Sequence, residues 1–450
     1  MNTPICDFAA RYNEQRASRF HMPGHKGIAR LGCEGLDITE IVGADSLYEA
    51  DGIIRESEKN AGELFGARTF YSAEGSSLAV RAMLDLARRF AAEHGHQPLV
   101  WAGRNAHISF VSTAALLDLR VHWLYPTDGG TYMSCIIDAG QLDRMLAEAD
   151  EAPAAVYITS PDYLGSMNDI RALAEVCHRH GALLLVDNAH GAYLKFLPRS
   201  LHPMDLGADI CCDSAHKTLP VLTGGTYLHI AKSAENFSDK AVRESLRLFG
   251  STSPSYLILQ SLDLANRYLA ERFPQELAAF VPQAEEAKRR LAAHGCTLVG
   301  QEPLKLTVAA KPCGYLGTEM AEALAEKKII AEFSDPDYVV FMLAPVQGKA
   351  ELDCLTEALL SLPRRESISA PMPAFSRPQR KMTIREAAMS PFETLPVNCC
   401  LGRTLARANA GCPPAVPILV SGEVIDKNAA ECFHYYGVKC CNVVKEQLQS

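Results

Sequence analysis

Between about residue 70 and residue 230, short apolar runs alternate with amphipathic stretches, and this alternation is the strongest constraint on the fold. Leu183–Val186 is apolar throughout, as is typical of a strand buried on both faces. Strands alternating with helices predict an α/β fold with a mostly parallel central sheet, whose ligands bind at the carboxyl ends of the strands. The expected strands are Leu99–Ala102, Val121–Tyr125, Ala155–Thr159, Leu183–Val186, Ile210–Cys212 and Thr226–Ile230, and the expected helices are Leu78–Phe90, which Ser76 or Ser77 would cap, and Ile170–His180.

From Pro254 to about Leu362 the pattern becomes more helical. Long amphipathic helices are expected at Tyr256–Leu269 and Gln275–Ala293, with short strands near Leu304–Ala309 and Tyr338–Leu343. This composition predicts a smaller α/β domain. Pro363–Pro378 has four prolines and reads as a linker. In the tail, prolines as dense as those of Pro413–Pro417 exclude a helix or a central strand and predict an ordered loop or edge.

Charge and cysteine content narrow the class of protein. The 450 residues carry 44 Lys and Arg against 53 Asp and Glu, a formal charge of −9, which argues against a nucleic-acid or anionic-membrane partner. The 15 cysteines form no Cys-x-x-Cys pair, so a zinc ribbon is not expected, and we expect no metal site. The N-terminus has no apolar core of the signal-peptide type, and no apolar run is long enough to span a bilayer. We expect reduced thiols in a cytoplasmic protein.

Two charged residues follow expected strands. Lys217 lies in Asp213-Ser214-Ala215-His216-Lys217-Thr218, directly after Ile210–Cys212. A lysine desolvated there would suit Schiff-base chemistry, but it could equally extend to solvent past the sheet edge. Asp187 follows Leu183–Val186 and could hold a protonated pyridine nitrogen, or simply cap the next helix.

Two further segments could bind a cofactor. Ala73-Glu74-Gly75-Ser76-Ser77 is a small polar turn before a helix, where backbone N–H groups and hydroxyls could bind phosphate or merely cap the helix. In Arg104-Asn105-Ala106-His107, after Leu99–Ala102, the imidazole could stack on a flat cofactor or serve as a structural hydrogen-bonding group.

These four features occur in the chain order of pyridoxal-phosphate enzymes of fold type I, and the chain resembles the bacterial ornithine/lysine/arginine decarboxylases in particular. The motifs that carry the resemblance are His21-Met22-Pro23-Gly24-His25-Lys26-Gly27, Phe65-Gly66-Ala67, Arg104–His107, Pro161-Asp162-Tyr163-Leu164-Gly165, Asp187-Asn188-Ala189-His190-Gly191, His216-Lys217, Ser251–Tyr256, and Pro413–Pro417 with Gly422-Glu423. The resemblance implies the aspartate-aminotransferase-like fold and pyridoxal 5'-phosphate as cofactor. It also implies decarboxylation of arginine, lysine or ornithine to the corresponding amine, as part of polyamine metabolism.

The resemblance also implies a role for individual residues. Lys217 matches the lysine that binds the cofactor covalently, and Asp187 the aspartate that pairs with the pyridine nitrogen. His107 matches the histidine stacked on the ring, with Ala189 on the opposite face. Ser76, Ser77, Ser214 and His216 correspond to residues near the phosphate, and Lys217 or His216 would return a proton to the substrate Cα. From position and charge alone, Glu423 and Asp45 are candidates to bind a basic substrate side chain.

The family pattern further implies the organisation and assembly of the chain. We expect an N-terminal arm at 1–45, a large cofactor-binding domain at 46–255, a small α/β domain at 256–362 and a C-terminal domain at 363–450, in a compact form without an N-terminal wing domain. A homodimer with its active site at the interface is expected, and Ser251-Thr252 would reach the partner's phosphate.

Four positions depart from the family pattern. Asn188 replaces the usual glutamate, Tyr193 a common histidine, Ala73-Glu74 a Val/Asn pair, and Asp162 a threonine. None of these changes removes Lys217 or Asp187. Two alternatives therefore stay open beside the decarboxylase: another lyase or aminotransferase of the same fold, and a catalytically silent cofactor-binding paralogue.

Overall fold

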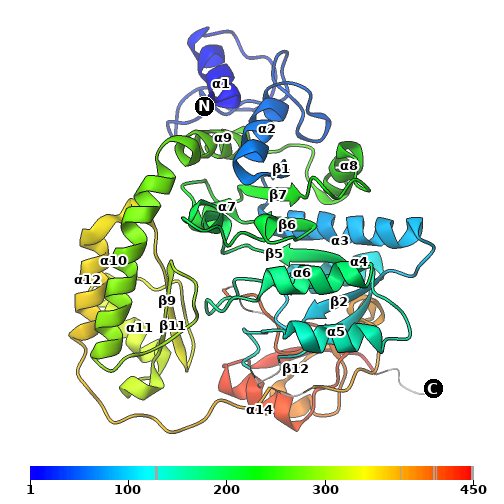
Figure 1. Cartoon of the computed structure of the whole chain (residues 1–450), viewed down its shortest axis with the longest axis vertical. Coiled ribbons are helices and arrows are strands. Elements are labelled where there is room, and N and C mark those ends of the chain that lie inside the picture. Colours follow the sequence, from blue (N-terminus) through cyan, green and yellow to red (C-terminus); the bar gives the residue numbers. More distant parts are fainter. Residues whose placement is uncertain (127–129, 376, 409–410, 412, 447–450) are drawn as a thin grey trace. The chain divides into compact units, whose positions relative to one another are not determined.

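The computed structural model describes residues 1–126, 130–375, 377–408, 411 and 413–446, and these form two compact units (Figure 1). Unit 1 comprises Met1–His96, Asp150–Ser160 and Asp169–Ala278. Unit 2 comprises Gln97–Ala149, Pro161–Asn168 and Ala279–Ser450. Helix α10 (Phe273–Ala293) has residues in both units. The finer division into four parts stays a prediction.

Unit 1 contains five adjacent strands in the order β1-β7-β6-β5-β4, namely Arg68–Ser72, Thr226–Ile230, Ile210–Asp213, Leu183–Asp187 and Ala155–Thr159. β4, β5 and β6 are mutually parallel, whereas β7 is antiparallel to both β6 and β1. The connection from β6 to β7 is too short for a parallel crossover, which needs a dozen or more residues, and so the chain turns back. The expectation of a mostly parallel sheet of buried strands is confirmed, with β1 as an additional edge strand that the sequence pattern did not indicate.

Helices cover this sheet and extend it towards the N-terminus. α3 (Gly75–Glu93) packs against β6, β7 and α8 (Asp239–Phe249), while α6 (Ile170–Arg179) packs against β5. The remaining helices of unit 1 are α1 (Pro4–Glu14), η1 (Leu47–Glu49), α2 (Ile53–Phe65), η2 (Ala192–Phe196), η3 (Pro203–Asp205), α7 (Ala215–Thr218) and α9 (Tyr256–Glu271). α2 contacts α1, α9 and β1, and it ties the first sixty residues to the sheet.

Unit 2 holds three groups of strands. β2 (Leu99–Gly103) and β3 (Arg120–Leu124) are a parallel pair connected through α4 (Ile108–Leu117). A four-stranded antiparallel sheet has the order β10-β11-β9-β8, from Phe333–Ser334, Tyr338–Met342, Lys305–Ala309 and Thr297–Val299. This sheet confirms the expected strands near 304–309 and 338–343.

The C-terminal tail adds a sheet of its own. β12 (Phe392–Pro396), β14 (Cys440–Val444) and β13 (Leu405–Arg407) form an antiparallel sheet in that order, and α14 (Lys427–Tyr435) contributes Phe433 to the core beneath it. Pro413–Pro417 lies outside helices and strands, as expected, and of Pro363–Pro378 the residues that the structure describes are irregular too, residue 376 lying outside them. The other helices of unit 2 are α5 (Ala139–Ala147), η4 (Lys311–Cys313), α11 (Gly317–Ala325), η5 (Pro345–Gln347), α12 (Gly348–Leu360), α13 (Ile384–Met389) and η6 (Val397–Cys399).

Among the described residues, no helix combines the length and apolar character needed to cross a membrane. The cysteines of the described part of the chain are all free thiols, and seven of them are buried.

Candidate functional site

Two buried parallel strands of unit 1 place the expected site residues at one edge of the sheet. β5 ends at Asp187 and β6 at Asp213, and Asp187 is in register with Cys212. One residue after β6, the single helical turn α7 (Ala215–Thr218) carries Lys217. The carboxyl ends of parallel strands are where α/β sheets bind ligands, so Asp187 and Lys217 lie where a cofactor would be expected.

The carboxylate of Asp187 is oriented by its own strands. Its Oδ2 accepts a hydrogen bond of 2.9 Å from the Tyr157 hydroxyl on β4, and its Oδ1 accepts one of 3.2 Å from the Ala189 backbone N–H. Burial, and after it the charge of Asp187, holds the pKa of Tyr157 well above its usual range, so this hydroxyl remains a donor at neutral pH. Asp187 is only 3% exposed, and such a carboxylate favours a protonated ring nitrogen as an additional partner.

Lys217 is half-buried, and its Nζ lies 3.2 Å from His190 Nε2. Beside it, His216 Nδ1 donates to the Gly225 carbonyl at 3.1 Å, which leaves Nε2 as the acceptor nitrogen of the neutral ring. Burial, and then the charge of Lys217, lowers the pKa of His216 and keeps this neutral form dominant. The structure thus puts a primary amine between two imidazoles, and His190 joins the predicted residues as a contact that only the Asp187–Gly191 motif could have indicated.

A buried network connects the ends of β5 and β6. Asn188 Nδ2 donates to Asp213 Oδ1 at 2.7 Å, while His202 Nε2 and His229 Nε2 donate to Asp213 Oδ2 at 2.9 and 3.1 Å. Burial opposes the charge of Asp213, but the two histidines outweigh it and hold the pKa of Asp213 well below its usual range. Asn188, a departure from the family pattern, is therefore the donor that a buried carboxylate at position 213 needs.

The proposed phosphate turn opens α3. Glu74 is the N-cap residue, its side chain makes no capping bond, and Ser76 and Ser77 lie inside the first helical turn. The expectation that Ser76 or Ser77 caps the helix is therefore wrong: Gly75, with φ of +71°, lets the helix begin before them. Backbone N–H groups and two hydroxyls at a helix N-terminus favour an anion.

Glu74 points away from that role, because its Oε1 accepts a hydrogen bond from the Ser251 backbone N–H. The turn is further fixed by the Gly75 N–H, which donates to the Gly224 carbonyl at 2.8 Å. The substitution of glutamate in this turn thus ties the turn to residue 251, close to the segment that the family pattern assigns to the partner's phosphate.

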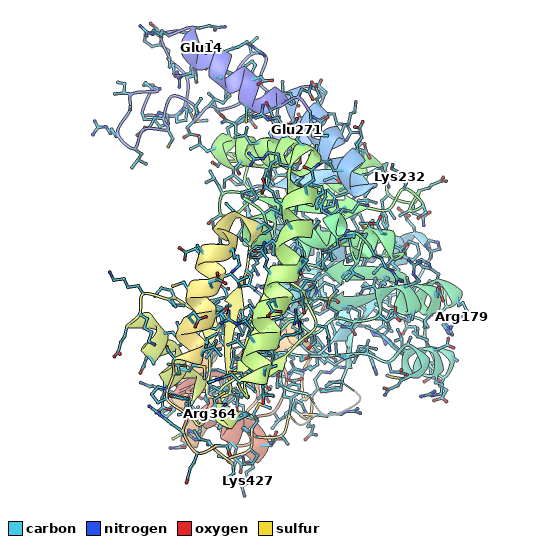
Figure 2. All side chains as sticks on the ribbon, turned by 60° about the vertical axis from the view of Figure 1, so that its left-hand side comes forward. Glu14, Arg179, Lys232, Glu271, Arg364 and Lys427 are labelled. Atoms are coloured by element: carbon cyan, nitrogen blue, oxygen red, sulfur yellow. The ribbon has the colours of Figure 1, made fainter. Side chains whose placement is uncertain are left out.

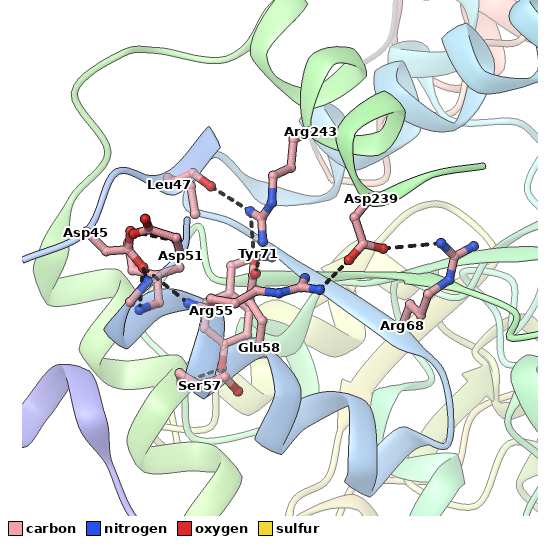
Figure 3. Close-up of polar contacts among 12 residues, drawn as sticks. Asp45, Leu47, Asp51, Arg55, Ser57, Glu58, Arg68, Tyr71, Asp239 and Arg243 are labelled. Carbon is pink, nitrogen blue, oxygen red and sulfur yellow. Dashed lines mark hydrogen bonds and ion pairs between the residues drawn. The ribbon is translucent and has the colours of Figure 1, made fainter. Parts of the chain in front are cut away.

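Asp45 has a clear structural environment (Figure 3). Its carboxylate accepts hydrogen bonds from the backbone N–H groups of Ser46, Asp51, Gly52, Ile54 and Arg55, and it is 4% exposed. Four of these donors lie at or next to the N-terminus of α2, where a carboxylate is stabilising. A role of Asp45 in substrate binding stays a prediction.

Two site residues expected from the sequence belong to unit 2. His107 is the N-cap of α4: its Nδ1 accepts from the Ser109 backbone N–H at 3.1 Å, so Nε2 carries the proton of the neutral ring. Glu423 Oε2 forms a salt bridge of 2.9 Å with Arg104 Nη2 and accepts from the Val420 N–H, with both side chains of the pair almost fully buried. Burial raises the pKa of Glu423, and Arg104 opposes the shift. The roles predicted for His107 and Glu423 stay predictions.

The donors in unit 1 fit pyridoxal 5'-phosphate. Ser214 Oγ is fully buried and has no hydrogen-bond partner among the described residues, although it lies three residues before Lys217. A buried hydroxyl without a partner is costly unless a ligand supplies one. Together with the open N-terminus of α3, the carboxylate of Asp187 and the amine of Lys217, it supplies contacts for the phosphate, the ring nitrogen and the aldehyde.

Comparison with known proteins gives a consistent result. A family model described as the Orn/Lys/Arg decarboxylase major domain matches residues 3–311. The chain is 28% identical to an arginine decarboxylase of Halalkalibacterium halodurans, over 95% of this chain and 91% of that protein, and 28% identical to an arginine decarboxylase of Bacillus subtilis, over 94% and 91%. In fold it is similar to the Francisella novicida lysine decarboxylase LdcF, with a TM-score of 0.80 at 16% identity over 98% of this chain and 81% of that one. The family match covers well over half of the sequence, and the chain therefore belongs to the Orn/Lys/Arg decarboxylase family.

Proposed function

We propose that this protein uses pyridoxal 5'-phosphate to decarboxylate a basic amino acid, arginine, lysine or ornithine, to the corresponding amine. The observation that carries the proposal is the pair Asp187 and Lys217 at the carboxyl ends of the adjacent parallel strands β5 and β6, in a chain of this family. The cofactor, when bound, supplies an electron sink for the bond that breaks at the substrate Cα.

Each residue has a task that follows from its surroundings. Asp187, held by Tyr157, would keep the ring nitrogen protonated. Lys217 Nζ would bind the cofactor aldehyde and yield its place to the substrate amine. After loss of CO2 a proton must return to Cα. Because His216 Nε2 carries no proton in the resting tautomer, we assign that proton to Lys217 Nζ and give His216 the role of acceptor.

Ser76, Ser77, Ser214 and the first turn of α3 would bind the phosphate. His107 and Ala189 would pack on the two faces of the ring, which the resemblance to the family supports. We also propose, on family grounds, a cytoplasmic homodimer whose active sites lie at the interface, with Ser251-Thr252 reaching the partner's phosphate.

The basic end of the substrate needs an acidic or polar partner. The carboxylates of Glu423 and Asp45 are both bonded to groups of this chain, so either would recognise a cation only by exchanging one of its donors. The two arginine decarboxylases among the relatives make arginine the first substrate to test.

The test is a substrate panel. Purified protein with added cofactor is incubated separately with arginine, lysine and ornithine, and both CO2 and the amine are quantified, with Lys217→Ala as the matched control. We expect stoichiometric CO2 and amine from at least one substrate and none from the control. Formation of a keto acid in place of CO2 would point to an aminotransferase, and no product from any of the three would refute the proposal.

A further inference from the structure

Two cysteines of unit 2 face each other across one edge of the small antiparallel sheet. Cys296 directly precedes Thr297, the first residue of β8, which is in register with Ala309 at the end of β9. Cys313 closes η4 just beyond β9, and its Sγ turns back to within 3.9 Å of the Ala309 carbonyl. The chain thus brings the two thiols together from positions 17 residues apart (313 − 296).

Both cysteines line a surface cavity of about 170 Å³, and both are partly exposed. The charged or titratable side chains that line it are His294, Arg364, Arg365 and Tyr315. Arg364 is held in place by a hydrogen bond to the His294 carbonyl at the end of α10, and Figure 2 shows it beside that end of the helix. A small reagent can therefore reach the sulfurs, and it meets positive charge there.

Three groups stabilise a thiolate on Cys313. The Cys296 thiol donates to the Cys313 sulfur, the Thr297 backbone N–H donates to it as well, and the guanidinium of Arg364 is close. In that order of importance they lower the pKa of Cys313 to about 7, whereas donation to Cys313 followed by burial raises the pKa of Cys296. A thiolate at neutral pH beside a thiol is the arrangement of a reactive and a resolving cysteine.

A second pair shows that proximity alone does not produce this chemistry. Cys441 donates to Cys400, but both side chains are fully buried. Burial raises the pKa of Cys400, and burial followed by the charge of Cys400 raises that of Cys441 to about 12. The Cys400–Cys441 pair is therefore an internal control, with the same two atoms in contact but neither access nor thiolate.

We propose that Cys313 and Cys296 form a redox-active dithiol that reacts with hydroperoxides and closes to a disulfide between η4 and the start of β8. The Cys313 thiolate attacks the terminal oxygen of the hydroperoxide, the O–O bond breaks, and hydroxide or an alkoxide leaves with the electron pair. The Cys296 sulfur then displaces water from the resulting sulfenic acid, so that two thiols are oxidised and one peroxide is reduced.

The first test uses the wild-type, cofactor-loaded protein with hydrogen peroxide as the probe. After a short exposure, remaining thiols are blocked and the digested protein is mapped by mass spectrometry without reduction. We expect a cross-link between the peptides that contain Cys296 and Cys313, reversed by dithiothreitol, while the Cys400 and Cys441 peptides stay reduced. A Cys296–Cys313 cross-link that forms no faster than one between Cys400 and Cys441, or none at all, would overturn the proposal.

Single variants test the order of events. In Cys296→Ala, peroxide should leave a sulfenic acid on Cys313 that a 1,3-dione reagent traps, whereas in Cys313→Ala residue 296 should stay reduced. The pH midpoint for alkylation of Cys313 by iodoacetamide should be about 7 in the wild type and higher in Cys296→Ala. Trapping on Cys296 in Cys313→Ala, or an unchanged midpoint in Cys296→Ala, would contradict the assignment. These readouts are independent of decarboxylase activity.

Discussion

Replacing Asn188 by aspartate tests the network that joins the ends of β5 and β6. The change exchanges a buried amide donor, 2.7 Å from Asp213 Oδ1, for a carboxylate oxygen at the same place. Both side chains are fully buried, so two negative charges in contact would repel by about 6 kcal/mol at an effective dielectric constant of ~20. The alternative is that residue 188 takes up a proton.

Proton uptake is the cheaper route. Protonating an aspartate of ordinary pKa at pH 7 costs about 4 kcal/mol, less than the repulsion, and the protonated form can donate to Asp213 in place of the lost amide. The folded-state pKa of the new carboxyl is thus raised above its unfolded value, so its stability is retained at low pH and lost as pH rises. We expect Asn188→Asp to lower the free energy of unfolding by about 4 kcal/mol at pH 7 but only by about 1.5 kcal/mol at pH 5.

Urea denaturation of the cofactor-free variant and wild type, followed by circular dichroism at pH 5, 6, 7 and 8, measures this difference. Asn236→Asp, at an exposed position, is the control for the added charge, and Asn188→Ala removes the donor without adding charge and should lose stability without this pH dependence. If Asn188→Asp is as stable as Asn236→Asp at pH 7, or if its deficit does not grow with pH, the network does not hold a buried charge at Asp213.

Three further predictions concern single side chains. Ser214→Ala should leave the free energy of unfolding of the cofactor-free protein unchanged or slightly higher, because no hydrogen bond is lost, yet weaken cofactor binding in equilibrium dialysis; a clear loss of stability would show that the hydroxyl has a protein partner. Asp45→Ala should lower the free energy of unfolding by about 2–4 kcal/mol in urea titrations, because five backbone donors lose their acceptor, and a loss below about 0.5 kcal/mol would contradict that role. Asp263, whose pKa burial raises to about 6, accepts from the Ile5 and Cys6 N–H groups at the start of α1; its contribution is fully present below pH about 4 and falls as pH rises, so the stability advantage of wild type over Asp263→Asn should shrink by about 3 kcal/mol between pH 4 and pH 7, and a constant difference would refute the assignment.

Local pattern was sufficient for the buried strands. Ala155–Thr159 and Thr226–Ile230 match β4 and β7 residue for residue, because fully buried strands are continuous apolar runs with β-branched residues. β1, Arg68–Ser72, lacks such a run and was not predicted; it is held by its antiparallel pairing with β7 and by the Tyr71 N–H bond to the buried Glu58. The three-stranded sheet of the tail also went unpredicted, since β12 and β14 are short and alternate in exposure.

For the candidate site, sequence reasoning could place residues on elements but could not pair them. Strand ends located Asp187 and Lys217, and the motif indicated His190. The partners of Asp45 and Glu423 are set by tertiary packing: five backbone N–H groups for Asp45, and an arginine 319 residues away in sequence for Glu423. A carboxylate chosen for its charge and position can thus already be committed to the fold, which nothing in the local sequence reveals.

The most direct measurement of the central claim is to locate the cofactor on the chain. The protein is loaded with pyridoxal 5'-phosphate, reduced with sodium borohydride so that the cofactor stays on the lysine that holds it, digested and mapped by mass spectrometry, with Lys217→Arg treated in parallel. We expect one pyridoxyl group per chain, on Lys217, and none at that peptide in the variant. A pyridoxyl group on a different lysine, or none in the wild type, would contradict the assignment of the site at the ends of β5 and β6.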